Sequence, residues 1–316
     1  MSMTIHDLAR LAGLNPSTVS RALRNDPRVR SATRERIAAL AAEHGYVPNL
    51  NARNLADGKT RIIALLMGSL EFQVEREAAV CLNEIFSEHG YTLMILSYAP
   101  KAEELYPARL KILTQKICDG AILFTPGDAF LTPETRSILG SIRCPRVYLD
   151  RWFREYPLPT VTTDNTVAMR GLCDLAESAG MDGAVLFFHE HNTVSRDRKE
   201  RLLRELKRRR IPHLEEFSAK TLPPFLQEHG IRNVTVFSNG VNDFRPLLPL
   251  LPRGFLTATF DRTLPEDRSS YGPIFLCIQN FRKIAEHAAD LLLRQLSGEV
   301  LVPQILTVPP AEFRTF

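Results

Sequence analysis

From residue 61 onward, apolar strands alternate with amphipathic helices, and this alternation restricts the possible folds more than any other feature. A first series begins with the apolar run 62–67 and reaches a strand at 146–149, and a second series begins near residue 160. Strands that alternate with helices form parallel sheets wound by right-handed crossovers. The pattern therefore predicts an α/β core of two doubly wound parallel-sheet subdomains, with a ligand cleft outside the carboxyl ends of the strands.

The predicted organisation has three parts, each with its own composition. They are a helix-turn-helix domain at 1–47, a hinge helix and linker at 48–60, and an effector-binding and dimerisation core at 61–316. The core is expected to divide into a first subdomain at about 61–158 with 280–303 and a second at about 159–279 with 304–316.

The N-terminal segment is typical of an all-α domain of three short helices. Thr4 and Asp7 approximate a capping box at the start of the first helix, and Gly13 ends that helix. Asn15 followed by Pro16 restarts the chain as a second helix, and a third helix follows Ser31, which is expected to cap it. Apolar side chains at helical spacing would form a small core.

The second helix is predicted to point polar groups away from that core. Ser17, Thr18, Ser20 and Arg21 are short hydrogen-bonding side chains and one guanidinium, which suit phosphates and base edges in a major groove. The alternative is an ordinary helical domain whose polar residues face water. Charge favours DNA, because residues 1–61 carry ten Lys and Arg against five Asp and Glu, whereas the whole chain has a net charge of only +4.

A short segment between the head and the core is the predicted hinge. Residues 51–55 are too few to form a stable helix alone, so this helix would fold on contact with DNA. Leu55 is apolar and has no obvious core there, which suits a wedge between base steps of the minor groove.

The head resembles that of the lactose repressor/galactose repressor (LacI/GalR) family of transcriptional regulators. The matching pieces are Ile5-His-Asp-Leu-Ala9, Ala12-Gly13, Ser17-Thr-Val-Ser-Arg21, Thr33-Arg-Glu, Gly45-Tyr-Val-Pro-Asn49 and Asn51-Ala-Arg-Asn-Leu55. The resemblance implies that Ser17, Thr18 and Arg21 read bases and that Leu55 intercalates. The full predicted DNA-binding set is Thr4, Asn15, Ser17, Thr18, Ser20, Arg21, Asn25, Asn51, Arg53 and Leu55.

Polar residues gather where the predicted core strands end. Asp150 and Arg151 follow one strand, Asn239 and Asp261 each follow another, and Arg198 begins a helix. Carboxylates, an amide and a guanidinium around one cleft suit a polyhydroxylated ligand such as a sugar. The alternative for each residue taken alone is a helix cap or a surface ion pair.

The family resemblance extends more weakly across the core, which looks periplasmic-binding-protein-like. It implies an effector pocket at Asp150, Arg198, Asn239 and Asp261, with Ser69 as a further candidate. Gln279 opens a segment similar to the fructose-type catabolite repressors, whose ligands are phosphosugars. The predicted effector-binding set is Ser69, Asp150, Arg151, Arg198, Asn239, Asp261 and Gln279. We expect the effector to be a sugar or phosphosugar that releases a repressor from its operator. The alternatives are a non-sugar metabolite such as a nucleobase, or an effector that acts as a corepressor or activator.

Other classes of function find little support in the sequence. Enzyme motifs such as Gly-x-Gly-x-x-Gly, a phosphate-binding Gly-Lys-Ser/Thr or His-Glu-x-x-His are missing, and His189-Glu190-His191 reads as a polar strand end. Neither a metal nor a cofactor is predicted. The five cysteines are scattered and read as buried thiols of a reducing compartment. The basic run 204–210 reads as a solvated helix face.

The expected setting and partners follow from the same features. With no signal peptide or membrane-length apolar run, the protein is expected in the cytoplasm. Pseudo-palindromic operator DNA and a small-molecule effector are the expected partners. With no heptad tail, a homodimer is expected rather than a tetramer.

Overall fold

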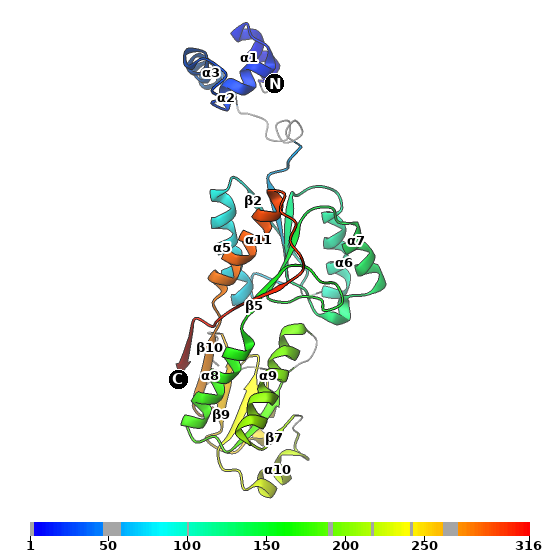
Figure 1. The fold of residues 1–316 in the computed structure, drawn as a ribbon, viewed down its shortest axis with the longest axis vertical. Coiled ribbons are helices and arrows are strands. Elements are labelled where there is room, and N and C mark those ends of the chain that lie inside the picture. The colour runs from blue at the N-terminus through cyan, green and yellow to red at the C-terminus, as the bar shows by residue number, and fades with distance from the viewer. Residues whose placement is uncertain are drawn as a thin grey trace. The chain divides into compact units, whose positions relative to one another are not determined.

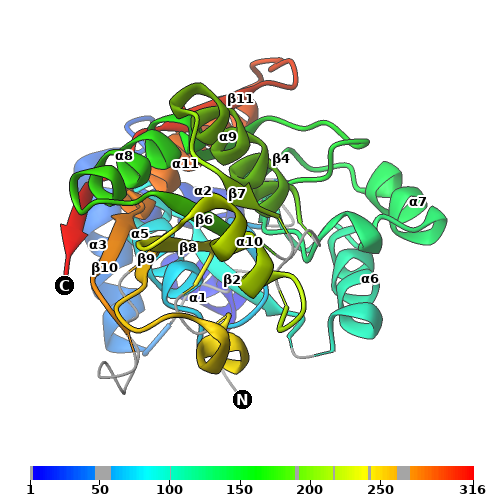
Figure 2. The ribbon, with the colours of Figure 1, turned by 90° about the horizontal axis from the view of Figure 1, so that it is seen from below.

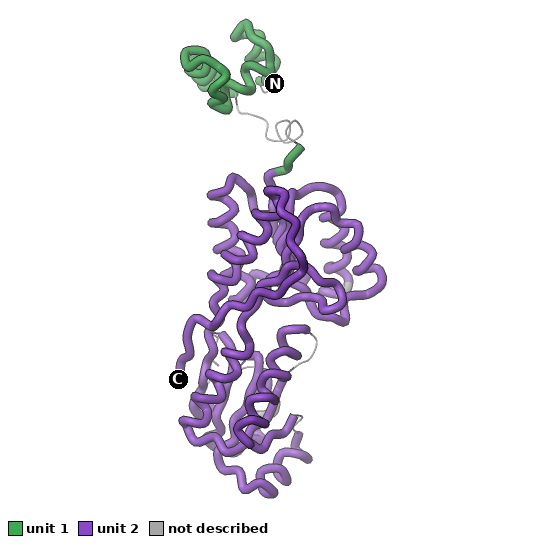
Figure 3. The backbone as a smooth tube through the Cα atoms, in the orientation of Figure 1, with its two compact units in different colours: residues 1–60 green, residues 61–316 purple. Residues whose placement is uncertain are grey.

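The computed structural model describes residues 3–46, 58–99, 101–188, 192–215, 218–240, 243–261 and 271–316. The chain separates into two compact units, residues 1–60 and 61–316 (Figure 3). The predicted hinge residues Asn51, Arg53 and Leu55, and also His189-Glu190-His191, lie outside the described residues. Along the described ranges, no helix is both long enough and apolar enough to cross a membrane.

The first unit contains three helices, α1 (Ile5–Ala12), α2 (Pro16–Leu23) and α3 (Ser31–Glu43). Leu8, Val19 and Ile37, one from each helix, are fully buried and form the centre of its core. The Thr4–Asp7 capping box is present, and Gly13 adopts the left-handed conformation at φ 67° that ends α1. The helix-turn-helix prediction is confirmed at the level of the backbone.

One predicted cap is wrong, and another occupies its predicted position without a capping hydrogen bond. The Asn15 side chain makes no capping hydrogen bond at the start of α2, although Asn15 does occupy the N-cap position. Arg30, not Ser31, is the N-cap residue of α3. Ser31 is already helical, and its hydroxyl donates to Glu35 Oε1 at 2.9 Å, one turn ahead. The second and third helices therefore begin without side-chain caps, and packing against α1 must hold them.

The first sheet of the second unit is entirely parallel, with strand order β11-β5-β4-β3-β1-β2. Helices α5 and α11 lie on one side of this sheet, and α6 and α7 lie on the other (Figure 1). Alternate residues of β1 face these two layers: Ile63 and Leu65 pack with residues of α5 and α11, while Ala64 and Leu66 pack with residues of α6 and α7. The strands are β1 (Ile62–Met67), β2 (Thr92–Ser97), β3 (Gly120–Leu123), β4 (Arg146–Leu149), β5 (Thr160–Thr163) and β11 (Ile305–Val308). The helices are α5 (Gln73–Glu88), α6 (Ala102–Leu113), η1 (Asp128–Phe130), α7 (Pro133–Ser141) and α11 (Phe281–Leu296).

The second sheet has strand order β12-β10-β9-β8-β6-β7 and is parallel except for its edge strand β12. Helices α8 and α9 cover one face, and α10 and η2 cover the other (Figure 2). The strands are β6 (Gly183–Phe187), β7 (His213–Leu214), β8 (Val234–Ser238), β9 (Leu256–Phe260), β10 (Ile274–Ile278) and β12 (Glu312–Thr315). The helices are α8 (Asn165–Ser178), α9 (Thr193–Arg209), α10 (Leu222–His229) and η2 (Arg245–Leu250). The predicted fold class, two parallel-sheet subdomains behind a helix-turn-helix domain, is confirmed.

The sequence assigned two strands to the wrong subdomain. β5 and β11 were expected in the second subdomain, but β5 pairs with β4, and β11 pairs with β5, so both extend the first sheet. The chain thus crosses between the sheets after β5, after β10 and after β11. Hydropathy identifies a buried strand but carries no information on which sheet supplies its hydrogen-bond partner.

Candidate functional site

A cavity of about 440 Å³ lies at the carboxyl ends of strands from both sheets. This volume is within the usual range for a small-molecule site. Six of the seven predicted effector residues line it: Asp150, Arg151, Arg198, Asn239, Asp261 and Gln279. Ser69 is not among the lining residues, and its backbone N–H donates to Glu75 Oε2 at 2.8 Å.

Arg198, on the second turn of α9, is the central cation of the cavity. It is only 5% exposed, and its guanidinium stacks 3.5 Å from the centre of the Phe260 ring. Its nitrogens donate to three amide oxygens: Asn165 Oδ1 at 3.2 Å, Asn239 Oδ1 at 3.1 Å and Gln279 Oε1 at 2.8 Å. These three acceptors are neutral, so none of these hydrogen bonds cancels the charge of Arg198, and burial lowers its pKa.

Two carboxylates face this cation from opposite sheets. Asp150 follows β4 with φ 62°, and Asp261 follows β9 with φ 66°, so both have left-handed backbone, which is uncommon for residues other than glycine and which aspartate adopts more readily than most. Backbone strain of this kind gathers at functional sites. Burial raises the pKa of Asp150 and raises that of Asp261 to about 6, against the opposing effect of Arg198. Holding two carboxylates beside the cavity therefore lowers the stability of the folded protein.

Gln279 and Asn239 connect these groups. Gln279 Nε2 donates to Asp261 Oδ1 at 2.9 Å, while its oxygen accepts from Thr163 Oγ1 at 2.7 Å as well as from Arg198. The amide nitrogen of Asn239 donates to Ser195 Oγ at 2.5 Å. Each amide therefore has a defined orientation, and the cavity wall is ordered by its own hydrogen bonds.

The sequence analysis did not single out several residues of this wall. Glu75, in the first turn of α5, is 2% exposed and forms an ion pair with Arg151, whose guanidinium also lies over the Phe124 ring at 5.5 Å. Asn165 bridges Arg198 and Asp197. An acidic residue in the first turn of a helix normally lies on the surface, where it interacts favourably with the helix dipole. The residue type and position of Glu75 therefore did not indicate that it is buried.

Helix α9 connects the two subdomains at the cavity. The Thr193 hydroxyl accepts from the backbone N–H of Trp152 at 3.2 Å and donates to its carbonyl at 2.6 Å. Val194 belongs to the apolar cluster of the first subdomain, whereas Leu202 and Leu206 belong to that of the second. The helix is therefore anchored in both, with Arg198 between the two anchors.

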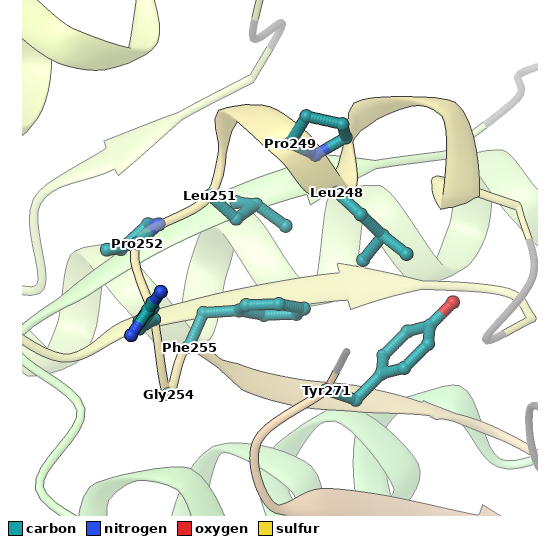
Figure 4. Close-up of a pocket in the computed structure, with 8 residues that line it drawn as sticks. Leu248, Pro249, Leu251, Pro252, Gly254, Phe255 and Tyr271 are labelled. Atoms are coloured by element: carbon teal, nitrogen blue, oxygen red, sulfur yellow. The ribbon is translucent and has the colours of Figure 1, made fainter. Parts of the chain in front are cut away.

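A second cavity, of about 620 Å³, lies between η2 and the amino end of β9. Figure 4 shows the rings of Phe255 and Tyr271 below Leu248 and Pro249. Arg253 is its one charged lining residue among those described. Although this cavity is larger, it lacks converging polar groups and lies away from the carboxyl ends of the strands, so the first cavity is the better candidate.

On the first unit, most of the described DNA-reading residues that were predicted lie on α2 or next to its ends, and Thr4 lies at the start of α1. Ser17 and Arg21, one turn apart on α2, are exposed, and Thr18 and Ser20 are half-buried. Thr4, Asn15 and Asn25 are exposed as well, and Asn25 has left-handed backbone at φ 55° after α2. Arg36 Nη2 donates to the Ala12 carbonyl at 2.9 Å and thereby ties α3 to the end of α1.

Comparison with known proteins identifies a matching family model and several relatives. Residues 4–49 match the family model described as "Bacterial regulatory proteins, lacI family". The HTH-type transcriptional regulator TreR of Escherichia coli (strain K12) is 34% identical over 124 residues, which are 39% of this chain and 38% of TreR. The regulator DegA of Bacillus subtilis (strain 168) is 35% identical over 167 residues, 52% of this chain and 49% of DegA. The matched region thus spans less than half of either relative.

Solved structures agree over a longer stretch. A Lac repressor dimer bound to operator and the anti-inducer ONPF has a TM-score of 0.75 at 20% identity, covering 98% of this chain and 97% of that one. The regulator Cra from Pseudomonas putida in complex with fructose 1-phosphate has a TM-score of 0.61 at 18% identity, covering 81% and 98%. At these identities the likeness establishes the fold.

Fold and site together define a helix-turn-helix domain joined to a two-sheet, periplasmic-binding-protein-like core. The chain carries a helix-turn-helix domain, its residues 4–49 match the lacI-family model, and the relatives TreR and DegA are HTH-type transcriptional regulators. The resemblance seen in the sequence is confirmed.

Proposed function

We propose that the protein is a sequence-specific transcriptional repressor that binds a pseudo-palindromic operator as a homodimer and responds to a neutral sugar. The observation that carries the ligand part is the cavity around Arg198. Its fixed amides, two carboxylates and two guanidinium groups can accept from and donate to neighbouring hydroxyl groups. As a DNA-binding regulator with a head of this bacterial type, the protein would act in the cytoplasm.

The charge of the cavity favours a neutral ligand over a phosphosugar. The described lining contains four carboxylates, Glu75, Asp150, Asp243 and Asp261, against two arginines. One of those arginines, Arg151, is already paired with Glu75. A phosphate would therefore enter a site with an excess of negative charge, with the buried Asp150 and the half-buried Asp261 on either side of Arg198, which costs several kcal/mol of repulsion and desolvation.

Thermal-shift screening of the full chain tests the ligand class. A panel of neutral mono- and disaccharides, their phosphates and nucleobases is compared, and a ligand present at about 100 times its Kd adds roughly 2.7 kcal/mol. We expect stabilisation by a neutral sugar that is lost in the Asn239→Ala variant. Stabilisation by a phosphosugar or a nucleobase alone would overturn the neutral-sugar proposal.

Operator binding is tested through Arg21. Since Arg21 is exposed on α2 and follows Ser17 by one turn, both can face the same base pairs of a major groove. We expect Arg21→Ala to weaken specific binding by about 1–3 kcal/mol in a gel shift. The matched control is Arg204→Ala, an exposed arginine on α9 of the core. Equal operator affinity in the two variants would remove Arg21 from the reading set. Operator binding that sugar strengthens would make the effector a corepressor.

The proposed dimer uses the open edge of the first sheet. β2 is an edge strand, Ile95 on it is 40% exposed, and Val80 on the neighbouring helix α5 is 55% exposed. An exposed edge strand with apolar side chains is normally covered by a partner. We place the second copy of the chain there.

A further inference from the structure

Two of the five cysteines lie close together at the amino ends of two neighbouring strands. Cys118 and Cys144 each precede a strand by two residues, β3 and β4 respectively, and these strands pair with Ala121 opposite Arg146. The two sulfur atoms are 3.9 Å apart, although 26 positions separate the residues in the chain. The sequence analysis took them for scattered thiols, because this proximity exists only once the sheet has formed.

The two thiols differ in access and acidity. Cys118 is 5% exposed within an apolar cluster, whereas Cys144 is half-buried and has access to solvent. The hydrogen bond from Cys118 lowers the pKa of Cys144 against the effect of burial, and the guanidinium of Arg146 acts in the same direction. Cys144 is thus the better nucleophile of the pair, and Cys118 is the thiol placed to attack whatever forms on it.

The pair also lies beside the point where the chain enters the core. Asp119 follows Cys118, and its Oδ2 accepts the backbone N–H of Arg61 at 3.0 Å. Arg61 is the first residue of the second unit and has left-handed backbone at φ 58°. Its guanidinium lies 5.8 Å from the centre of the Tyr91 ring. The carboxylate next to Cys118 therefore holds a strained residue at the start of the core.

We propose that Cys118 and Cys144 form an oxidation site, which a small-molecule disulfide such as glutathione disulfide converts to an intramolecular disulfide. The Cys144 thiolate attacks one sulfur of glutathione disulfide and releases one glutathione thiolate. Cys118 then loses its proton to water and attacks the Cys144 sulfur, releasing the second glutathione. Two protein thiols are oxidised, and one disulfide is reduced to two thiols.

Closing the bond moves the backbone that holds Arg61. The sulfurs must approach from 3.9 Å to about 2 Å, and Cys118 is the residue adjoining Asp119. The displacement of the Asp119 carboxylate weakens its hydrogen bond with the Arg61 N–H. This inference does not depend on the proposed operator or sugar.

The experiment uses the full chain in glutathione buffers of graded oxidation, quenched by alkylation and analysed by peptide mass spectrometry. We expect two of the five thiols to disappear together, with the Cys118 and Cys144 peptides cross-linked and no glutathione retained. Cys118→Ala should instead keep glutathione on Cys144. Cys173→Ala, which removes a buried thiol from the second subdomain, should leave the cross-link unchanged.

Hydrogen exchange measures how the disulfide affects the start of the core at Arg61. In the cross-linked protein, the Arg61 amide should exchange on the order of tenfold faster, as the loss of one amide hydrogen bond implies. The oxidation site would be overturned if all five thiols could still be alkylated in oxidising buffer. It would also be overturned if the wild-type chain retained glutathione on Cys144, as Cys118→Ala is expected to do. A cross-linked chain with unchanged Arg61 exchange would overturn its effect on Asp119.

Discussion

Replacing Asp261 with asparagine should stabilise the core above pH 6 and have little effect below pH 4. Burial raises the pKa of Asp261 in the folded protein from its ordinary value of 3.8 to about 6. Between these two values the folded state binds the proton more tightly than the unfolded state does. Wild-type stability therefore falls as the pH rises through this window. At about 1.4 kcal/mol per pKa unit, the ionised carboxylate costs about 3 kcal/mol above the window.

Asparagine removes that cost without removing the local hydrogen bond, because its oxygen can still accept from Gln279 Nε2. The stability difference between Asp261→Asn and wild type should thus grow from near zero at pH 4 to about 3 kcal/mol at pH 7. Urea unfolding followed by fluorescence measures it in the full chain, since Trp152 is the sole tryptophan and lies in the core.

Asp290→Asn is the matched control, because this carboxylate is exposed on α11. The control should show no comparable gain over the same pH range. A difference between Asp261→Asn and wild type that does not change with pH would refute a raised pKa for the half-buried Asp261 carboxylate.

Four further outcomes are expected. Arg198→Met should destabilise the core by about 3–5 kcal/mol, since it leaves buried carboxylates without their cation, and it should abolish any ligand-induced thermal shift. Leu55→Ala should retain folding and ligand binding but lose tight, bent operator complexes in gel shifts, and normal operator affinity would contradict a wedge. Ile95→Glu should give monomers in sedimentation, whereas an unchanged dimer would place the interface elsewhere. Gly13→Ala should cost about 1 kcal/mol in unfolding of the head, purely through its φ of 67°, because a Cβ there meets no atom within 4 Å.

The grouping of the predicted core residues around one cavity has a simple geometric reason, although their role in binding an effector stays a prediction. Parallel strands all end at the same edge of a sheet, so Asp150, Asn239 and Asp261 could be assigned to one cleft before any contact was known. The helical periodicity of residues 281–296 is also visible in the sequence, and α11 spans Phe281–Leu296.

What sequence reasoning missed depends on contacts between distant segments. Strands β5 and β11 have the composition of buried strands of either sheet, and only their hydrogen bonds to β4 and to each other assign them. Glu75 and Arg151 are separated by 75 intervening residues, so their ion pair could not be seen as a pattern. The short strand β12 has no apolar alternation, and its pairing with β10 is what makes it a strand.

Helix α9 explains how ligand binding and subdomain movement can be one event. Thr193 and Val194 hold its first turn to the first subdomain, and Leu202 holds its body to the second. Arg198 lies between these anchors, and its guanidinium reaches Gln279, at the end of β10, where the chain crosses back to the first sheet. A ligand bound to Arg198 therefore contacts a side chain that joins α9, which is anchored in both subdomains, to a crossover between them. Any difference in its affinity for two arrangements of the subdomains is then transmitted as a shift between those arrangements.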